Sequence, residues 1–156
     1  MNITVEEIEV EDNDLLEKMV QLYLHDISKY FKIDFDSTKC EYEYDISSYF
    51  IFNKAYFIKS DDNILGFILL DINSNDDFEI SEIFVLNNYK NNKVGTKAIR
   101  LIFDMYKGKF IIKVVPNSKK AEKFWENTVK DYTNNNYEIE HNGEENRIIL
   151  SFVTNN

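Results

Sequence analysis

The segment from Phe78 to Trp125, FEISEIFVLNNYKNNKVGTKAIRLIFDMYKGKFIIKVVPNSKKAEKFW, contains two strand-like runs with a helical run between them. The strand-like runs are Phe78 to Leu86 and Phe110 to Val115, and Pro116, the only proline, stops the second. The helical run has one apolar face, made of Ala98, Ile99, Ile102, Phe103 and Tyr106. A strand, a helix and a strand in succession predict that the two strands are parallel neighbours.

The flanking sequence predicts antiparallel strands around this unit. A short strand at Ile3 to Val10 leads into a helix from Asn13. Gly108 is expected as a left-handed cap at the end of the helical run that contains Ala98 and Tyr106. Turn-forming residues separate further expected elements, which are strands at Ala55 to Lys59 and Ile64 to Ile72, a short helix at Tyr44 to Phe50, a helix at Ser118 to Lys130, and a hairpin of Tyr137 to Glu140 and Ile148 to Val153 around Asn142-Gly143. We therefore expect a single α/β domain over residues 1–156, with a mixed, mostly antiparallel sheet flanked by helices.

Composition narrows the class of protein. A hydrophobic fraction of 44% and an aromatic fraction of 15% predict a packed core. The sequence lacks an apolar run of about 18 residues and a signal-peptide pattern, so we expect no membrane partner. Cys40 is the only cysteine, which excludes an internal disulfide and fits a reducing cytoplasm. With two histidines, His25 and His141, the chain offers no metal cluster or nucleophilic triad.

The charge is unevenly distributed. The net charge of −10 argues against nucleic acid as a partner. Residues 88–123, however, hold ten Lys and Arg residues against Asp104 and Glu122, a net charge of +8, which leaves −18 for the rest. Each lysine alone is typical of a solvated surface, but the clustering predicts a local anion site.

The sequence Tyr89-Lys90-Asn91-Asn92-Lys93-Val94-Gly95-Thr96-Lys97 joins the first strand to the helix N-terminus. Free backbone N–H groups and the helix dipole favour an anion there, and Gly95 allows close approach of a ligand. A Walker A loop and a dinucleotide fingerprint are excluded, because their required residues are absent. An ordinary strand–helix connection has a similar sequence, so the turn alone does not decide the function.

Three sequence features together resemble the GNAT acetyltransferase superfamily. They are Ile83-Phe84-Val85, the turn from Lys90 to Gly95, and Ala121-x-x-Phe124-Trp125. The resemblance implies a GNAT-like sheet whose parallel pair splays apart, and acetyl-CoA as co-substrate. It implies that the backbone of Ile83, Phe84 and Val85 contacts the pantetheine arm. It also implies that the loop from Lys90 through Lys93, Val94, Gly95, Thr96 and Lys97 holds the pyrophosphate; Lys93 stands where the family has its first glycine.

The helix after Pro116 carries the remaining family pattern, an Asn followed by Ala-x-x-Phe-Tyr. Ser118 falls at the Asn position with Asn117 beside it, and Phe124 matches the phenylalanine. Trp125 replaces the tyrosine that protonates the leaving thiolate in many members, and an indole cannot act as that acid. Trp125 can still pack against the cofactor, and Tyr132 is the candidate substitute acid.

Glu82 is the candidate general base. Strand alternation places Phe78, Ile80, Glu82, Phe84 and Leu86 on one face, so the carboxyl interrupts an apolar row. Desolvation there raises a carboxyl pKa toward the range of a useful base. The resemblance agrees, since the family often has a Glu near this point that deprotonates the amine through water. The alternative is a paired structural carboxylate.

The first helix supplies the candidate acceptor-binding residues. Leu16, Val20, Tyr23 and Ile27 lie on one apolar stripe, and His25 points about 180° away from it. His25 therefore favours the surface, but the resemblance implies that this helix borders the acceptor. Tyr23 and Asp26 are the alternatives of similar weight.

We expect an N-acetyltransferase that acts on a primary amine of a small molecule or peptide. The acidic remainder of the chain suits a cationic acceptor. Two alternatives remain open: a non-catalytic acyl-CoA sensor, and an interaction domain without cofactor. The oligomeric state is open as well, with a homodimer as one option.

Overall fold

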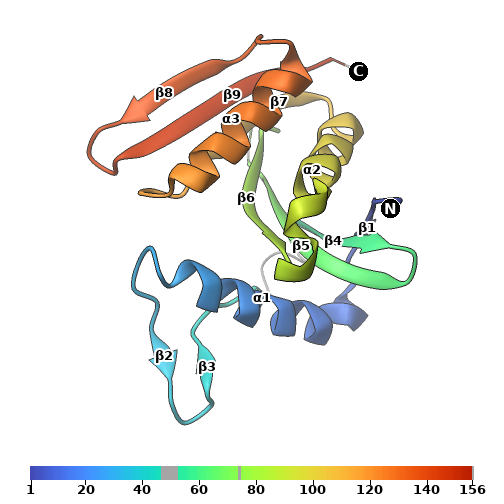
Figure 1. The fold of residues 1–156 in the computed structure, drawn as a ribbon, viewed down its shortest axis with the longest axis vertical. Coiled ribbons are helices and arrows are strands. Elements are labelled where there is room, and N and C mark those ends of the chain that lie inside the picture. Colours follow the sequence, from blue (N-terminus) through green and yellow to red (C-terminus); the bar gives the residue numbers. More distant parts are fainter. Residues whose placement is uncertain (47–52, 74, 156) are drawn as a thin grey trace.

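The computed structural model describes residues 1–46, 53–73 and 75–155. A seven-stranded sheet has the order β1-β4-β5-β6-β7-β9-β8, and every neighbouring pair is antiparallel except β6 and β7 (Figure 1). The predicted mixed, mostly antiparallel sheet is confirmed. Its strands are β1 (Thr4–Glu7), β4 (Lys54–Ser60), β5 (Asn63–Ile72), β6 (Phe78–Val85), β7 (Gly108–Lys113), β8 (Glu138–Asn142) and β9 (Arg147–Thr154).

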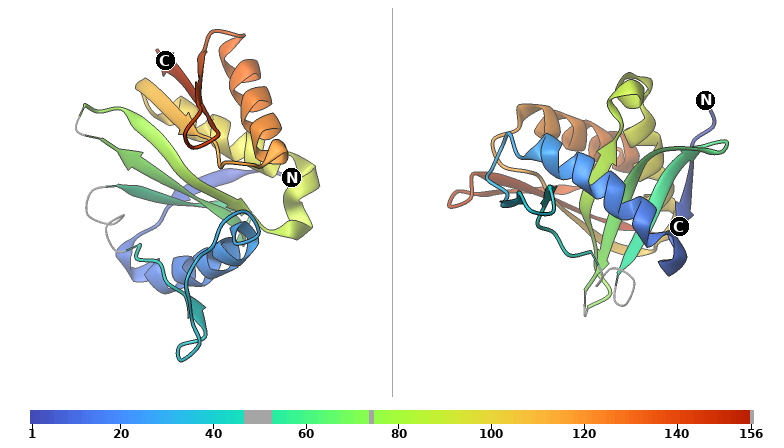
Figure 2. Two further views of the ribbon diagram at one scale, coloured as in Figure 1. Left: turned by 90° about the vertical axis from the view of Figure 1, so that its left-hand side faces the viewer. Right: turned by 90° about the horizontal axis from the view of Figure 1, so that it is seen from below.

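In the described part of the chain, α-helices cover both faces of the sheet (Figure 2). α1 (Asn13–Ile27) packs Leu16, Val20 and Leu24 on one face. α2 (Val94–Met105) and α3 (Lys119–Thr133) cover the other face, where they bury residues such as Ile99 and Val129. Because strand side chains alternate, β5 contributes to both cores, with Ile68 and Leu70 on the α2 and α3 side and Phe67 and Leu69 on the α1 side. Leu65 also joins the α2 and α3 side, because a bulge in the pairing with β4 shifts the alternation there. The described helices include none that is both long and apolar enough to cross a membrane.

The parallel strands β6 and β7 separate soon after they meet. Their register contains only Phe78 opposite Phe110 and Glu79 opposite Ile111. Beyond this point β7 remains paired with β9, up to Lys113 opposite Ile149. The later part of β6 and the end of β7 therefore diverge, as the left view of Figure 2 shows. The predicted splayed parallel pair is present.

A β-bulge corrects the predicted face of β6. Leu69 pairs with Glu82 and Leu70 with Ile80, so Ser81 is an extra residue in the ladder. Phe78 and Ile80 consequently belong to the core under α2 and α3, while Phe84 belongs to the core under α1. The prediction that all of these share one face was wrong, because alternation fails across a bulge. Glu82 lies on the α1 side.

Gly108 is not the cap of α2. The helix ends at Met105, Tyr106 is extended, and Gly108 is the first residue of β7 with a φ of +143°. A Cβ there would lie 3.1 Å from the Phe78 ring. Glycine is thus required by the start of the strand and its packing, where the sequence pattern suggested a helix cap.

Smaller differences concern connections. The C-terminal hairpin turns through the four residues 143–146, since Asn142 still pairs with Arg147. Asn142 Oδ1 accepts hydrogen bonds from the N–H groups of Glu144 and Glu145. The turn before α2 contains a short helix, η3 (Asn87–Asn92). A second short helix, η1 (Val10–Asp12), precedes α1. A small hairpin of β2 (Phe35–Asp36) and β3 (Glu41–Tyr42) follows α1. The predicted helix at Tyr44 to Phe50 falls mostly outside the described residues, and 44–46 are not helical.

Candidate active site

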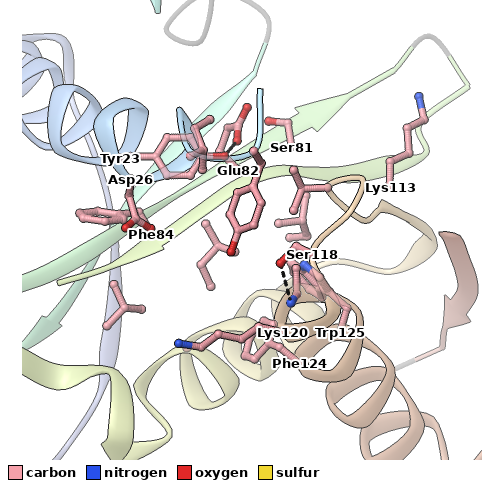
Figure 3. A pocket seen from close by; sticks show the side chains of 18 of the residues that line it. Tyr23, Asp26, Ser81, Glu82, Phe84, Lys113, Ser118, Lys120, Phe124 and Trp125 are labelled. Atoms are coloured by element: carbon pink, nitrogen blue, oxygen red, sulfur yellow. Dashed lines mark hydrogen bonds between the residues drawn. The ribbon is translucent and has the colours of Figure 1, made fainter. Parts of the chain in front are cut away.

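A cavity of about 650 Å³ occupies the divergence of β6 and β7 (Figure 3). β6 forms one wall, and the start of α3 with the end of β7 forms the opposite wall. α1, η3 and the N-terminus of α2 complete it. Thirteen of the predicted site residues line it: Tyr23, Asp26, Glu82, Ile83, Phe84, Val85, Lys90, Lys93, Gly95, Thr96, Ser118, Phe124 and Trp125.

Glu82 lies on the cavity wall with its carboxylate against α1. It accepts a hydrogen bond from the hydroxyl of Tyr23, whose ring packs edge-on to Phe67, 5.7 Å between centroids. Burial raises the pKa of Glu82 to about 7, and the negative charges of Asp71 and Glu79 add to this, while the Tyr23 hydrogen bond lowers the pKa. A carboxyl that titrates near neutrality can take up a proton at physiological pH.

The edge of β6 that faces the cavity has no partner strand beyond Glu79 within the described parts of the chain. The N–H of Leu86 donates to Leu65 of β5 at 2.8 Å. Because backbone groups alternate between the two edges of a strand, Ile83 and Val85 direct their N–H and C=O groups away from β5 and toward the splayed side. Two backbone donors are thereby available along the cavity wall.

The N-terminus of α2 opens onto the same cavity. Lys93 precedes the helix in a left-handed conformation, with φ 56° and ψ 27°, and supplies no side-chain cap. The N–H of Lys97 is the first to bond within the helix, to Lys93 O at 3.0 Å, so the N–H groups of Val94, Gly95 and Thr96 have no intrahelical acceptor. Their dipoles favour an anion at this end of the cavity.

Gly95 lies in the first turn of α2, where this helix comes close to α3. A Cβ at Gly95 would lie 3.4 Å from the Phe124 ring and 3.7 Å from Val85, which are ordinary van der Waals contacts. Packing would therefore accept an alanine here. The role that remains for the glycine is close access of a ligand to the backbone at the helix end.

Positive charge surrounds the cavity. Lys90 pairs with Asp26 of α1 at 3.7 Å, and Lys113 pairs with Glu79 at 3.6 Å. The cations that line the cavity outnumber the carboxylates Asp26, Glu79 and Glu82, and are Lys29, Lys90, Lys93, Lys113, Lys120 and Arg147. An anionic ligand is favoured over a cationic one in this space.

The start of α3 places three predicted residues. Ser118 is the N-cap, and its hydroxyl accepts from the N–H of Ala121 at 3.1 Å, as the dashed line in Figure 3 marks. Trp125 is only 7% exposed and packs against Phe124 with 5.1 Å between ring centroids. Both rings contribute apolar wall opposite β6.

Five predicted residues are not part of the lining. Tyr132, the candidate substitute acid, donates its hydroxyl to Asp104 at 2.8 Å and packs beside Phe103, so it lies outside the lining of this cavity. His25 is exposed and its Nδ1 lies 2.9 Å from the Tyr42 hydroxyl, so it does not border the cavity. The side chain of Asn117 binds Asn146, while Val94 is buried in the core and Lys97 points to solvent.

Several lining residues escaped the sequence analysis. The turn that follows α1 contributes Tyr30 and Phe31, and no motif in the sequence singled them out. Lys113 and Lys120 belong to the basic segment of residues 88–123, but nothing in their spacing separates them from surface lysines. Arg147 comes from the C-terminal hairpin and carries no local signal.

Comparison with known proteins agrees with this geometry. The profile of the Acetyltransferase (GNAT) family matches residues 16–129. Among curated proteins, none matches the sequence. The family profile covers most of the chain, and the chain belongs to the GNAT acetyltransferase family.

Solved structures share the fold at low sequence identity. An acetyltransferase from Thermus thermophilus has a TM-score of 0.71 and 11% identity, covering 98% of this chain and 97% of that one. The ribosomal-protein-S18-alanine N-acetyltransferase of Escherichia coli has a TM-score of 0.67 and 10% identity, and the match covers 99% of this chain and 96% of that one. Spermidine N-acetyltransferase from Vibrio cholerae, in complex with CoA and spermine, has a TM-score of 0.63 and 13% identity. This match covers 97% of this chain and 95% of that one.

Proposed function

We propose that this protein transfers an acetyl group from acetyl-CoA to a primary amine of a small molecule or peptide, by direct attack of the amine. One observation carries the proposal: Glu82, whose pKa is raised to about 7, shares a cavity with the uncapped N-terminus of α2. A phosphate-binding helix end and a carboxyl poised as a base are the two parts that this reaction needs.

The acetyl-CoA would lie along the cavity. The N–H groups of Val94, Gly95 and Thr96 would bind the pyrophosphate, with Lys90 and Lys93 beside them and Lys97 adding positive charge from the exposed face. The pantetheine arm would bond the backbone of Ile83 and Val85. The start of α3, with Asn117 next to the lining, would cover the opposite side of the arm through Ser118, Phe124 and Trp125.

The amine must lose its proton before it attacks. Glu82 would accept that proton through a water molecule, and the neutral nitrogen would then form a bond with the thioester carbonyl carbon. A free N–H on β6 would stabilise the negative oxygen of the tetrahedral intermediate. The nitrogen becomes positively charged on attack and gives up its second proton to water. When the carbon–sulfur bond breaks, the CoA thiolate leaves and takes a proton from solvent, since Trp125 has no acidic proton to give.

The second candidate function is a non-catalytic acyl-CoA sensor. Trp125 favours it, because a buried indole stands on the cavity wall where many family members have an acidic hydroxyl. Such a protein would bind acetyl-CoA without turning it over.

Two measurements decide between these functions. Acetyl-CoA at well above micromolar concentration is expected to raise the melting temperature, since a ligand that binds only the folded state stabilises it. No shift would favour an interaction domain without cofactor. Release of CoA thiol with a panel of primary amines is then expected for the enzyme, and binding without amine-dependent release identifies the sensor.

A further inference from the structure

A second cavity, of about 350 Å³, adjoins the first and shares Ile27, Phe31 and Glu82 with it. Glu82 is thus the titratable group common to both spaces. None of the residues proposed above to bind acetyl-CoA lines the second cavity. Its position beside the candidate base makes it the natural space for the acceptor.

The walls of the second cavity are held in place by the β2–β3 hairpin, which extends from the body next to α1 (Figure 1). Gln21 of α1 fixes the hairpin through two hydrogen bonds to the backbone of Tyr42. The N–H of Tyr42 donates to Gln21 Oε1 at 2.7 Å, and Gln21 Nε2 donates to Tyr42 O at 2.9 Å. At the base of the hairpin, Glu43 N–H donates to Asp34 O at 3.0 Å. Asp34 and Glu43 are therefore neighbours on the rim of the cavity.

The two cavities carry opposite charge. Six cations line the acetyl-CoA cavity, whereas Lys32 is the one cation among the described residues that line the second. The second cavity has three carboxyl groups, from Asp34, Glu43 and Glu82. A space with excess negative charge attracts positive ligands and disfavours a second anion such as a phosphate.

The remaining walls are apolar. Leu24, Ile27 and Ile33 offer aliphatic surface, and Phe31 and Tyr44 offer aromatic rings. Aliphatic surface suits a chain of methylene groups, and aromatic rings suit an ammonium group. A strongly hydroxylated ligand such as a sugar would leave its polar groups unpaired on such walls.

We propose that the second cavity binds the acceptor, and that the acceptor is an aliphatic amine bearing a second positive charge. The reactive amine lies at Glu82, and the second ammonium group lies at Asp34 and Glu43. The methylene chain between them packs on Ile27, Ile33 and Phe31. This assignment rests on the N-acetyltransferase function proposed above and adds the class of substrate.

Three amines with the same five-carbon chain test the assignment: diaminopentane, aminopentanol and aminopentane. The thiol-release assay is expected to give diaminopentane a kcat/KM at least about tenfold above either of the others. The double variant Asp34→Asn/Glu43→Gln is expected to bring that ratio close to one. The matched control, Asp61→Asn/Asp62→Asn, removes two carboxylates from the β4–β5 turn and is expected to keep the ratio.

Equal rates for the three amines, or a ratio that survives in the Asp34→Asn/Glu43→Gln protein, would overturn the assignment. A preference for a lysine-containing peptide over diaminopentane would overturn it too. If none of the amines releases thiol, the proposed catalysis has failed, and calorimetric binding of diaminopentane to the CoA-loaded protein decides the cavity's role. Binding that the double variant loses supports the assignment, and absent or unaltered binding overturns it.

Discussion

The hydroxyl of Tyr23 donates a hydrogen bond to the carboxylate of Glu82, although 59 positions separate them along the chain. The contact joins α1 to the bulged strand β6 at the wall shared by two cavities. The same hydrogen bond stabilises the ionised carboxylate, while burial destabilises it. The balance of these two effects sets the pH at which the candidate base works.

Replacing Glu82 by Gln tests the base directly. In the unchanged protein, kcat/KM should rise with pH around 7, because the carboxyl must be ionised to accept a proton. Glu82→Gln should lower kcat/KM about 100-fold or more and abolish the rise of kcat/KM with pH around 7. The exposed Glu138→Gln serves as control and should keep both rate and profile. A Glu82→Gln protein with an unaltered pH profile would show that another group is the base.

Tyr23→Phe should move the rise of kcat/KM with pH to higher pH. The substitution removes the hydrogen bond that lowers the pKa of Glu82, so the remaining burial raises that pKa further above 7. The ring contacts with Phe67 and Phe84 are retained, which keeps the fold. The midpoint of kcat/KM against pH measures the effect. A midpoint that stays in place or falls contradicts the role assigned to this hydroxyl.

Glu82 should also make the stability of the protein depend on pH. Its folded pKa is raised from 4.5 to about 7, so its favourable contribution is complete below pH 4.5 and is lost as pH rises through 7. Relative to Glu82→Gln, the unchanged protein should lose about 3 kcal/mol of unfolding free energy across this window. Urea unfolding of both proteins at each end of the window measures it. A constant difference between them would mean that the carboxyl is not buried in its ionised state.

Gly66→Ala should damage the cavity wall through the backbone. A Cβ at Gly66 would lie 1.9 Å from the carbonyl oxygen of Phe84, so β5 and β6 would have to separate there. We expect a loss of about 2 kcal/mol or more in unfolding free energy. The stabilisation by acetyl-CoA should shrink as well, because Ile83 and Val85 move with the strand. Gly143→Ala is the control, since nothing lies within 4 Å of its Cβ position.

Lys93→Gly should stabilise the protein relative to Lys93→Ala. Both variants lose the same charge, but only glycine adopts the left-handed conformation of residue 93 without steric cost. The difference in unfolding free energy should be roughly 1 kcal/mol in favour of glycine. Chemical denaturation of the two variants gives the number directly. Equal stabilities would mean that the turn relaxes when the lysine is removed.

Local pattern predicted the elements of the fold well. The helix from Asn13, the meander that ends in β6, and the α2 crossover to β7 came from periodicity and turn formers within about ten residues of each element. The faces of β6 were predicted wrongly after Ile80, because the bulge at Ser81 depends on how β5 pairs with it. The prediction of Gly108 as a helix cap was wrong as well, since the need for glycine there comes from its packing against the Phe78 ring.

The sequence by itself determined the order of strands and helices, the basic turn before α2 and an ionisable residue within an apolar strand. These are properties of neighbouring residues, and hydrophobic periodicity and charge record them directly. Only the tertiary structure decided that Tyr23 meets Glu82, that Tyr132 turns away to Asp104, and that Asp34 and Glu43 share a rim beside the base. Such contacts join distant segments through packing across the sheet, and no local pattern encodes which distant side chains meet.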